Sequence, residues 1–154
     1  SAAIQTASNA LASHNPDVRE SARKAMCAVA NVLGTAQLPS LIAALCNSLR
    51  KGYQLHVLGY TLHAMLSGVA ENAAPGELDR SVDSLVPILS EDIMGIAAEE
   101  RGVGKIAAKG KEAKKCCSYD SLSILARRVQ FRADGETVTA LIGAVEQLTP
   151  RCTS

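Results

Sequence analysis

The chain has 154 residues, of which 47% are hydrophobic and 20% are charged, and its formal net charge is +1. This length is sufficient for one domain with a sizeable core, and the composition excludes an intrinsically disordered chain. Aromatic residues make up 3% of the chain and Trp is absent, so the core has to be built from aliphatic side chains and Ala. Sequences rich in Ala and Leu favour helices.

The first two predicted helices lie between the N-terminus and Gly34. Residues 2–13 carry apolar side chains at helical spacing. Asn15 is the predicted N-cap of the next helix, Pro16 suits its first turn, and Gly34 is its predicted C-terminal cap. The apolar stripe of this second helix is expected to face the core and consists of Val18, Ala22, Ala25, Val29, Val32 and Leu33.

The rest of the chain is also predicted to be helical, with Gly52 separating two of the helices. Pro87 falls inside a predicted helix and is expected to kink it or to end it early. Residues 96–117 form a less regular basic segment, and no sustained period-two alternation indicates a strand. The further helices are predicted, in chain order, at residues 38–49, 55–69, 78–96, 118–131 and 138–148.

Two features of the composition bear on the cellular compartment. Residues 25–49 carry no formal charge, but Gly34 and Pro39 interrupt them, so this stretch predicts two antiparallel helices rather than a membrane span. The cysteines are odd in number and fit no disulfide framework, which favours a reducing compartment. They are Cys27, Cys46, Cys116, Cys117 and Cys152.

The helices are expected to form antiparallel pairs joined by short loops. The openings at 38–42 and 85–89 resemble each other and lie about 47 residues apart, within the HEAT/armadillo range. The Asp-Val-Arg run at 17–19 followed by Ala22 resembles the signature of a second HEAT helix. The expected fold is all-α, an α-solenoid fragment of HEAT/armadillo-like antiparallel helical repeats that fills 1–154 as a single segment. The approximate repeats are residues 2–34, 38–70, 78–131 and 136–149.

Patterns of catalytic or metal-binding chemistry are weak. The Gly-Val-Gly-Lys run at 102–105 resembles the end of a phosphate-binding loop, but Glu99 and Ile106 stand where that loop needs Gly and Ser or Thr. His56 and His63 share a helix face, and a zinc site would need more ligands. The stripe to which they belong is expected to pack against a neighbouring repeat and consists of Gly52, His56, Tyr60, His63 and Ser67.

Cys116 and Cys117 are the remaining candidates for a nucleophile. They lie among lysines, which lower the pKa of a thiol, but no general base is identifiable beside them, so inert thiols are expected. The sequence therefore predicts no enzyme activity, no cofactor and no metal site.

The basic segment is the candidate functional site. Residues 101–132 contain nine basic and two acidic residues, against seven basic and thirteen acidic residues elsewhere. If residues 101–117 form a helix, most of its basic side chains lie on one face of that helix. Lys114 and Glu112 do not fit this pattern. Such a face binds phosphates through counterion release; the alternatives are a solvated face or an acidic protein partner. No aromatic residue interleaves with the lysines, so the expected contact is to the RNA backbone. The candidate RNA-binding residues are Arg101, Lys105, Lys109, Lys111, Lys115, Arg127 and Arg128.

Two blocks of sequence resemble a known family. Residues 49–66 read Leu-Arg-Lys-Gly-Tyr-Gln-Leu-His-Val-Leu-Gly-Tyr-Thr-Leu-His-Ala-Met-Leu. Farther along, Ser-Glu-Asp-Ile-Met-Gly at 90–95 is followed by Glu-Ala-Lys-Lys at 112–115 and by Ser-Tyr-Asp-Ser at 118–121. These blocks resemble the family of U3 small nucleolar RNA-associated protein 20, also called down-regulated in metastasis protein, over about residues 38–130.

The resemblance implies a segment of a very large HEAT-repeat protein of the nucleus and nucleolus. It implies an architectural scaffold in small ribosomal subunit (18S pre-rRNA) biogenesis that binds pre-ribosomal RNA and assembly factors in the small-subunit processome. The implied partners are processome proteins, pre-ribosomal RNA, the U3 small nucleolar ribonucleoprotein and neighbouring repeats of the same protein, with no membrane. The alternative is a HEAT-repeat scaffold that binds only proteins, without RNA contact.

Overall fold

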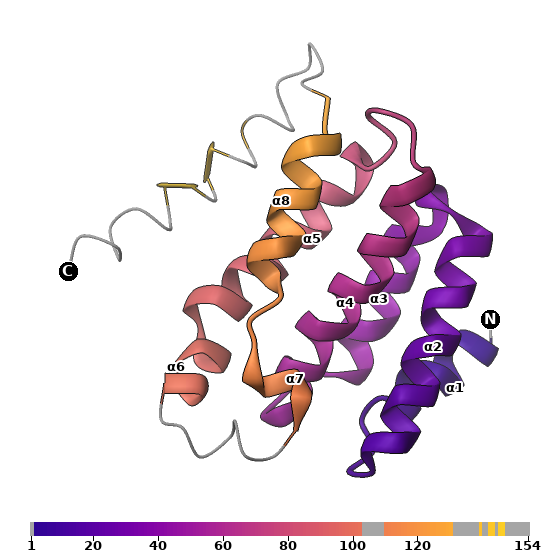
Figure 1. The fold of residues 1–154 in the computed structure, drawn as a ribbon, viewed down its shortest axis with the longest axis vertical. Coiled ribbons are helices and arrows are strands. Elements are labelled where there is room, and N and C mark those ends of the chain that lie inside the picture. Colours follow the sequence, from indigo (N-terminus) through magenta and orange to yellow (C-terminus); the bar gives the residue numbers. More distant parts are fainter. Residues whose placement is uncertain (1, 103–109, 131–138, 140–141, 144, 147–154) are drawn as a thin grey trace.

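A computed structural model of the chain describes residues 2–102, 110–130, 139, 142–143 and 145–146. Over these residues it contains helices and turns and no strand (Figure 1), so the all-α prediction is confirmed. The predicted helix at 138–148 and Cys152 lie largely or wholly outside the described residues. The elements are α1 (Ala2–Ala10), α2 (Pro16–Leu33), η1 (Thr35–Gln37), α3 (Leu38–Ser48), α4 (Tyr53–Asn72), α5 (Asp79–Met94), α6 (Ile96–Gly102), α7 (Lys111–Lys114) and α8 (Ser118–Arg128).

Both predicted caps of α2 are present in the structure. The side-chain oxygen of Asn15 accepts a hydrogen bond from the backbone N–H of Asp17 at 2.8 Å, and Pro16 opens the first turn. At the other end, the N–H of Gly34 donates to the carbonyl of Ala30 at 2.8 Å. Gly34 has φ of 69°, a conformation that favours glycine. Local chemistry therefore fixes where α2 begins and ends.

Helix α5 continues through Pro87 to Met94, so the expected early end of this helix is wrong. Proline has no backbone N–H, and Pro87 therefore cannot donate to the carbonyl of Asp83 one turn earlier. The ring of Pro87 lies on an exposed face of α5, where water can reach that part of the helix. The surrounding packing holds the helix together on its buried side.

The helices are stacked in two layers (Figure 1). In one layer α3 contacts both α1 and α5, and in the other α4 contacts both α2 and α8. Contacts of α1 with α2, of α3 with α4 and of α5 with α8 join the layers. Helix α4 lies at the centre, because it also touches α6 and α7. This arrangement is compatible with an α-solenoid.

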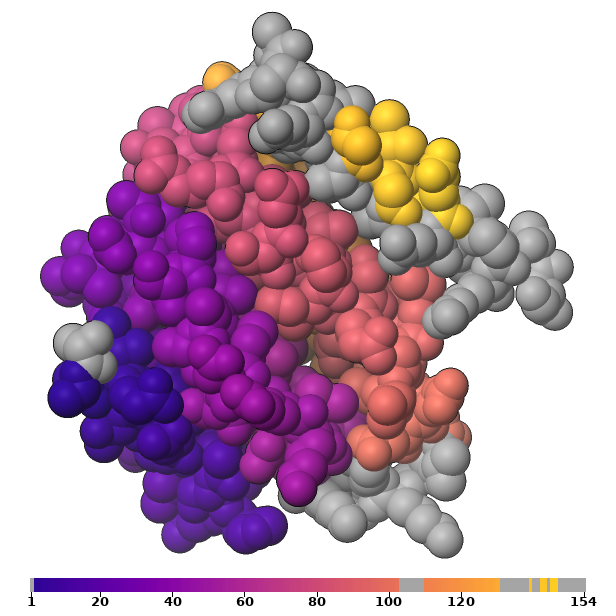
Figure 2. Space-filling model, turned by 180° about the vertical axis from the view of Figure 1, so that it is seen from behind, coloured from indigo at the N-terminus to yellow at the C-terminus, as the bar shows by residue number. Residues whose placement is uncertain are grey.

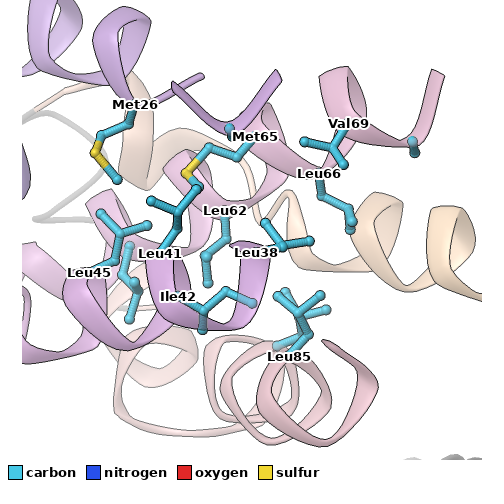
Figure 3. Packing of buried hydrophobic residues seen from close by; sticks show 14 of the residues in the cluster. Met26, Leu38, Leu41, Ile42, Leu45, Leu62, Met65, Leu66, Val69 and Leu85 are labelled. Carbon is cyan, nitrogen blue, oxygen red and sulfur yellow. The ribbon is translucent and has the colours of Figure 1, made fainter. Parts of the chain in front are cut away.

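The core lies between the two layers and is aliphatic, as the composition predicts. Met26 of α2, Leu45 of α3 and Met65 of α4 are all 0% exposed. Figure 3 shows these side chains converging with Leu41 between α2, α3 and α4. Leu85 brings α5 into the same cluster. One continuous apolar cluster thus connects α2 through α5, with Leu125 of α8 at its edge.

The prediction that the apolar stripe of α2 faces the core is wrong for most residues of the stripe. Val32 is 85% exposed, and Val18, Ala25 and Leu33 are also exposed. The helix is rotated because its inner face carries two arginines that have buried partners, described below. The buried residues of α2 are Arg19, Ala22, Arg23, Met26 and Ala30.

No single helix among the described residues is long and apolar enough to cross a membrane. The segments Pro16–Leu33 and Thr35–Ser48 meet the length and composition criteria only as a pair, and they are bent by 114° relative to each other. The break between them falls at Gly34, one of the two positions at which the sequence predicts the apolar stretch to be interrupted.

Met65→Ala tests the position of the core. Removing this fully buried side chain leaves a cavity between α2, α3 and α4, so we expect the free energy of unfolding to fall by about 2–5 kcal/mol. Urea denaturation followed by circular dichroism measures it. The control is Val32→Ala on the exposed face of α2, for which we expect a change within about 0.5 kcal/mol. A larger loss for Val32→Ala than for Met65→Ala would contradict this core.

Candidate nucleic-acid interface

The described part of the basic segment is not one continuous helix. Helix α6 is described as far as Gly102, and α7 spans only Lys111–Lys114. On either side of α7, Gly110 and Lys115 have extended backbones, with Lys115 at φ −134° and ψ 132°. The arc of bases calculated for a helix over 101–117 is therefore wrong. Lys105 and Lys109, two of the predicted RNA-binding residues, lie outside the described residues.

Arg101 and Arg128 of the predicted set form contacts within the protein. The guanidinium of Arg101 forms an ion pair with the carboxylate of Asp92 and donates to its backbone carbonyl at 2.7 Å. Arg128 donates from Nη1 to the carbonyl of Ala73 at 3.0 Å. The first contact joins α6 to α5 and the second joins α8 to the end of α4. Both arginines therefore have a structural role in this fold.

Lys111 and Lys115 are paired with acids on the surface. Lys111 Nζ lies 2.6 Å from Glu20 Oε2, and Lys115 Nζ lies 2.6 Å from Asp120 Oδ2. Exposed pairs of this kind contribute little to stability, and salt screens them. A phosphate can replace either acid, so these two lysines stay available in a way that Arg101 does not.

Two exposed basic side chains are unpaired in the described part of the basic region, residues 101–102 and 110–130. Lys114, at the end of α7, and Arg127, near the end of α8, are exposed and have no ion pair or hydrogen bond to another described side chain. Lys114 is the residue that departed from the predicted helical arc. The structure thus divides the described members of the predicted set into structural arginines, paired surface lysines and the free Arg127, and it does not gather these members on one helix face.

Glu112, the acidic residue that does not fit the predicted basic arc, is buried and binds several helices together. Its side chain is 2% exposed. Oε1 accepts hydrogen bonds from Arg19 Nε at 3.0 Å and from Arg23 Nη2 at 2.7 Å, and Oε2 accepts one from the hydroxyl of Tyr53 at 2.8 Å. Helix α7 is thereby bound to α2 and to α4. We call Glu112, Arg19, Arg23 and Tyr53 the Glu112 cluster.

Aromatic rings complete the surroundings of the buried cations. The guanidinium carbon of Arg19 lies 5.2 Å from the ring centre of Tyr53, and that of Arg23 lies 4.7 Å from the ring centre of Tyr60. Lys111 Nζ also lies over the Tyr60 ring, 5.6 Å from its centre. These distances fit cation–π contacts. Buried ion pairs of this kind persist only with additional partners, and the rings supply them.

The Glu112 cluster shifts the pKa of its acidic members in opposite directions. Burial raises the pKa of Glu112, but hydrogen bonds from Arg19, from its own backbone, from Tyr53 and from Arg23 outweigh burial and lower it to about 2. Burial, and then the hydrogen bond to Glu112, raise the pKa of Tyr53 to about 12. Glu112 is therefore ionised and Tyr53 protonated at neutral pH.

Glu112→Gln tests this cluster. The change leaves two buried guanidinium groups without their counter-charge, so we expect the free energy of unfolding to fall by about 3–5 kcal/mol at pH 7. Because folding lowers the pKa of Glu112 from 4.5 to about 2, its stabilisation is complete above pH 4.5 and is lost as the pH falls toward 2. The variant should accordingly show a weaker loss of stability over that range in pH-dependent urea titrations.

Asp120→Asn is the matched control, because Asp120 belongs to an exposed ion pair with Lys115. We expect little change in stability for this variant and a wild-type pH dependence below 4.5. If Asp120→Asn were as harmful as Glu112→Gln, the buried position of Glu112 would not be the cause of its effect.

A second buried carboxylate, Asp92 of α5, holds the chain between α6 and α8. Besides Arg101, it accepts a hydrogen bond from the hydroxyl of Ser118 at 2.5 Å, and the sulfur of Cys116 lies 3.3 Å from Oδ2. Helix α4 approaches this carboxylate at Gly59, where a Cβ atom would lie 2.7 Å from Asp92 Oδ2. Glycine is needed there for close packing.

The thiols beside this carboxylate are not activated. Burial, followed by the negative charge of Asp92, raises the pKa of Cys116. Burial also raises the pKa of Cys117, and Lys115 only partly counteracts it. The neighbouring lysines therefore do not lower the pKa of either thiol, because burial and the nearby acids have the larger effect.

Gly59→Ala and Gly68→Ala form a matched pair within α4. A Cβ at Gly59 would collide with Asp92, which Arg101 and Ser118 hold in place, so we expect a loss of about 1–3 kcal/mol in the free energy of unfolding. A Cβ at Gly68 would meet the side-chain oxygen of Asn31 at 2.8 Å. Asn31 is exposed and can move, so Gly68→Ala should stabilise the helix by up to about 1 kcal/mol. Thermal unfolding of both variants measures which of the two is more stable.

The histidines of α4 pack against the C-terminal elements. His56 is 0% exposed and its Nε2 lies 3.1 Å from Glu100 Oε2 of α6. His63 Nδ1 lies 3.1 Å from Ser121 Oγ of α8. The two histidines of the stripe thus pack against neighbouring elements, as the sequence indicates, whereas Gly52 is exposed. Among the described residues, no group of three His, Cys, Asp or Glu side chains is placed to hold a metal ion.

Comparison with known proteins places the chain in a family. Residues 1–151 match the family model described as the U3 small nucleolar RNA-associated protein 20 domain. The chain is 37% identical over 121 residues to U3 small nucleolar RNA-associated protein 20 of Schizosaccharomyces pombe, which is 79% of the chain and 5% of that protein. Against the protein of the same name from Saccharomyces cerevisiae, identity is 33% over 125 residues, 81% of the chain and 5% of that protein. The matched part of the chain therefore spans about one-twentieth of these relatives, and the chain belongs to the family of U3 small nucleolar RNA-associated protein 20.

Proposed function

We propose that the chain is a segment of an architectural scaffold that acts in the biogenesis of the small ribosomal subunit, in the small-subunit processome of the nucleolus. The observation that carries the proposal is the family match over residues 1–151, to proteins named for their association with U3 small nucleolar RNA. The two layers of stacked helices support a role in binding and positioning partners rather than in catalysis. The partners proposed are processome proteins, the U3 small nucleolar ribonucleoprotein and pre-ribosomal RNA.

The helix pairs support an assignment to HEAT/armadillo-like repeats. Helices α1 and α2, α3 and α4, and α5 and α8 correspond to the repeats expected at residues 2–34, 38–70 and 78–131. In a solenoid each repeat packs on its neighbours. The exposed aliphatic side chains of Val18, Val32 and Leu33 on α2 support a contact with a further repeat of the same protein.

We also propose RNA contact through the basic segment, but with a smaller set of residues than the sequence predicts. Arg101 and Arg128 stabilise the fold, and Lys111 neighbours the Glu112 cluster, so changing them would disturb the structure as well as any RNA contact. Among the described residues, those suited to phosphate contact are the exposed bases that make no buried contact, Lys114, Lys115 and Arg127. Lys105 and Lys109 lie outside the described residues and stay in the proposal on the sequence pattern alone.

The test is ultraviolet crosslinking of the tagged full-length protein to RNA in cells, followed by sequencing of the recovered RNA. One variant carries Glu at Lys105, Lys109, Lys114, Lys115 and Arg127. A matched control carries Glu at three exposed bases elsewhere on the chain, Lys24, Lys51 and Arg80. We expect enrichment of pre-ribosomal or U3 RNA, a reduction of at least threefold in the first variant, and no reduction in the control.

The outcomes separate the two functions that the sequence leaves open. Enrichment that both variants retain would support a ribosome-assembly scaffold whose RNA contact lies elsewhere in the protein. Absence of ribosomal and U3 RNA would overturn the RNA contact and favour the alternative, a scaffold that binds only proteins.

A further inference from the structure

A hollow of about 280 Å³ lies between α4, α5 and α6. Its walls are apolar, with Leu55 and Leu58 from α4, Pro87 and Ile88 from α5, and Ala97 from α6. Figure 2 shows it as an opening in the surface between these helices. The volume lies just below the range of about 300–1,000 Å³ for small-molecule pockets, and it suits the side chain of a partner better than a cofactor.

The lining of the hollow also includes Asp92, which is held by Arg101 and Ser118 and approached by Gly59. The apolar walls are only partly covered, because Leu55 and Ile88 are half-buried and Pro87 is exposed. These side chains offer apolar area that a partner can remove from water.

The edge of the hollow is acidic. Residues 81–100, which form most of α5 and α6, contain five acidic residues and no basic residue. Glu91 borders the hollow, and Asp83 lies one helical turn before the lining residue Pro87 on the same face of α5; both acids are exposed. In the described residues neither forms an ion pair, whereas Asp92 is neutralised by Arg101. The charge left at the surface here is therefore negative.

We propose that this hollow binds a basic peptide segment of a protein partner. The segment inserts a bulky aliphatic side chain between Leu55 and Ile88, and its Lys or Arg side chains face Glu91 and Asp83. Apolar anchors in small pockets dominate the energy of such interfaces, and surrounding charges set the choice of partner. RNA is the wrong chemistry for this face, because the carboxylates repel phosphates. The site is thus independent of the proposed RNA contact.

The first test is fluorescence anisotropy with three 16-residue helical peptides. One carries Leu on one face and Lys on the other, the second has Ala in place of Leu, and the third has Glu in place of Lys. We expect the Leu/Lys peptide to bind at least tenfold more tightly than either of the others. Equal binding of the Ala/Lys peptide would show a purely electrostatic contact and would overturn the apolar anchor.

Matched variants locate the bound peptide. Leu55→Ala with Ile88→Ala should weaken binding at least fivefold, whereas Val32→Ala with Leu33→Ala, which removes exposed aliphatic groups from α2, should leave it unchanged. Glu91→Gln with Asp83→Asn should weaken binding at least threefold, and Glu71→Gln should not. Gln at position 91 keeps the acceptor for the N–H of Ile96. Thermal unfolding verifies that each variant is folded.

The second test uses the full-length protein in cells, with a photo-crosslinking amino acid at Ile88 and, as a control, at the exposed Glu71. Peptides captured at Ile88 and absent at Glu71 are identified by mass spectrometry. We expect segments of net positive charge that contain a bulky aliphatic residue at the crosslink. Acidic segments, RNA, or capture no greater than at Glu71 would overturn the proposal. Because the Leu55 and Ile88 variants should leave RNA crosslinking intact, failure here is distinguishable from failure of the proposed function.

Discussion

The carboxylate of Glu112 accepts hydrogen bonds from Arg19, Arg23 and Tyr53, and the arrangement of the N-terminal and C-terminal elements depends on it. Two arginines on the inner face of α2 would be prohibitively costly to bury alone, because each carries a full charge out of water. Glu112 supplies the counter-charge from the four-residue helix α7. The same contact positions α7 against α4, so one buried anion joins three elements that are distant in sequence.

This interaction also explains where prediction from the sequence succeeds and where it fails. The caps at Asn15 and Gly34 and the core residues of α3 and α4 are predictable, because their signals lie within one helix. The rotation of α2 is not, because Arg19 and Glu112 are 93 residues apart. The apolar pattern of α2 predicts that Val32 is buried. The opposite face is buried instead because Arg19 has a partner far away in the sequence, which the pattern of a single helix cannot reveal.

Prediction of the candidate site from the sequence is limited in the same way. Counting charges identifies residues 101–132 as basic, but it cannot distinguish a base that holds the fold together from one that is free to bind. Arg101 is bound by Asp92 of the preceding helix, and Lys115 is paired with Asp120 at the surface. Lys114, which falls outside the predicted arc, is unpaired in the described part of the chain. Which bases are available is decided by the positions of their acidic partners, and those follow from the tertiary fold.

Internal pairing also determines which charges face a partner. Glu112 neutralises charge on α2, and Asp92 neutralises Arg101, so the charges that remain exposed are separated on the molecule. Free bases remain on α7 and α8, on the side seen in Figure 1, and free acids remain beside the hollow seen from behind in Figure 2. The described part of the chain thus offers surfaces of opposite sign. Under the two proposals made above, the basic surface takes RNA and the acidic hollow takes a basic protein segment, so the fold keeps the two partners apart.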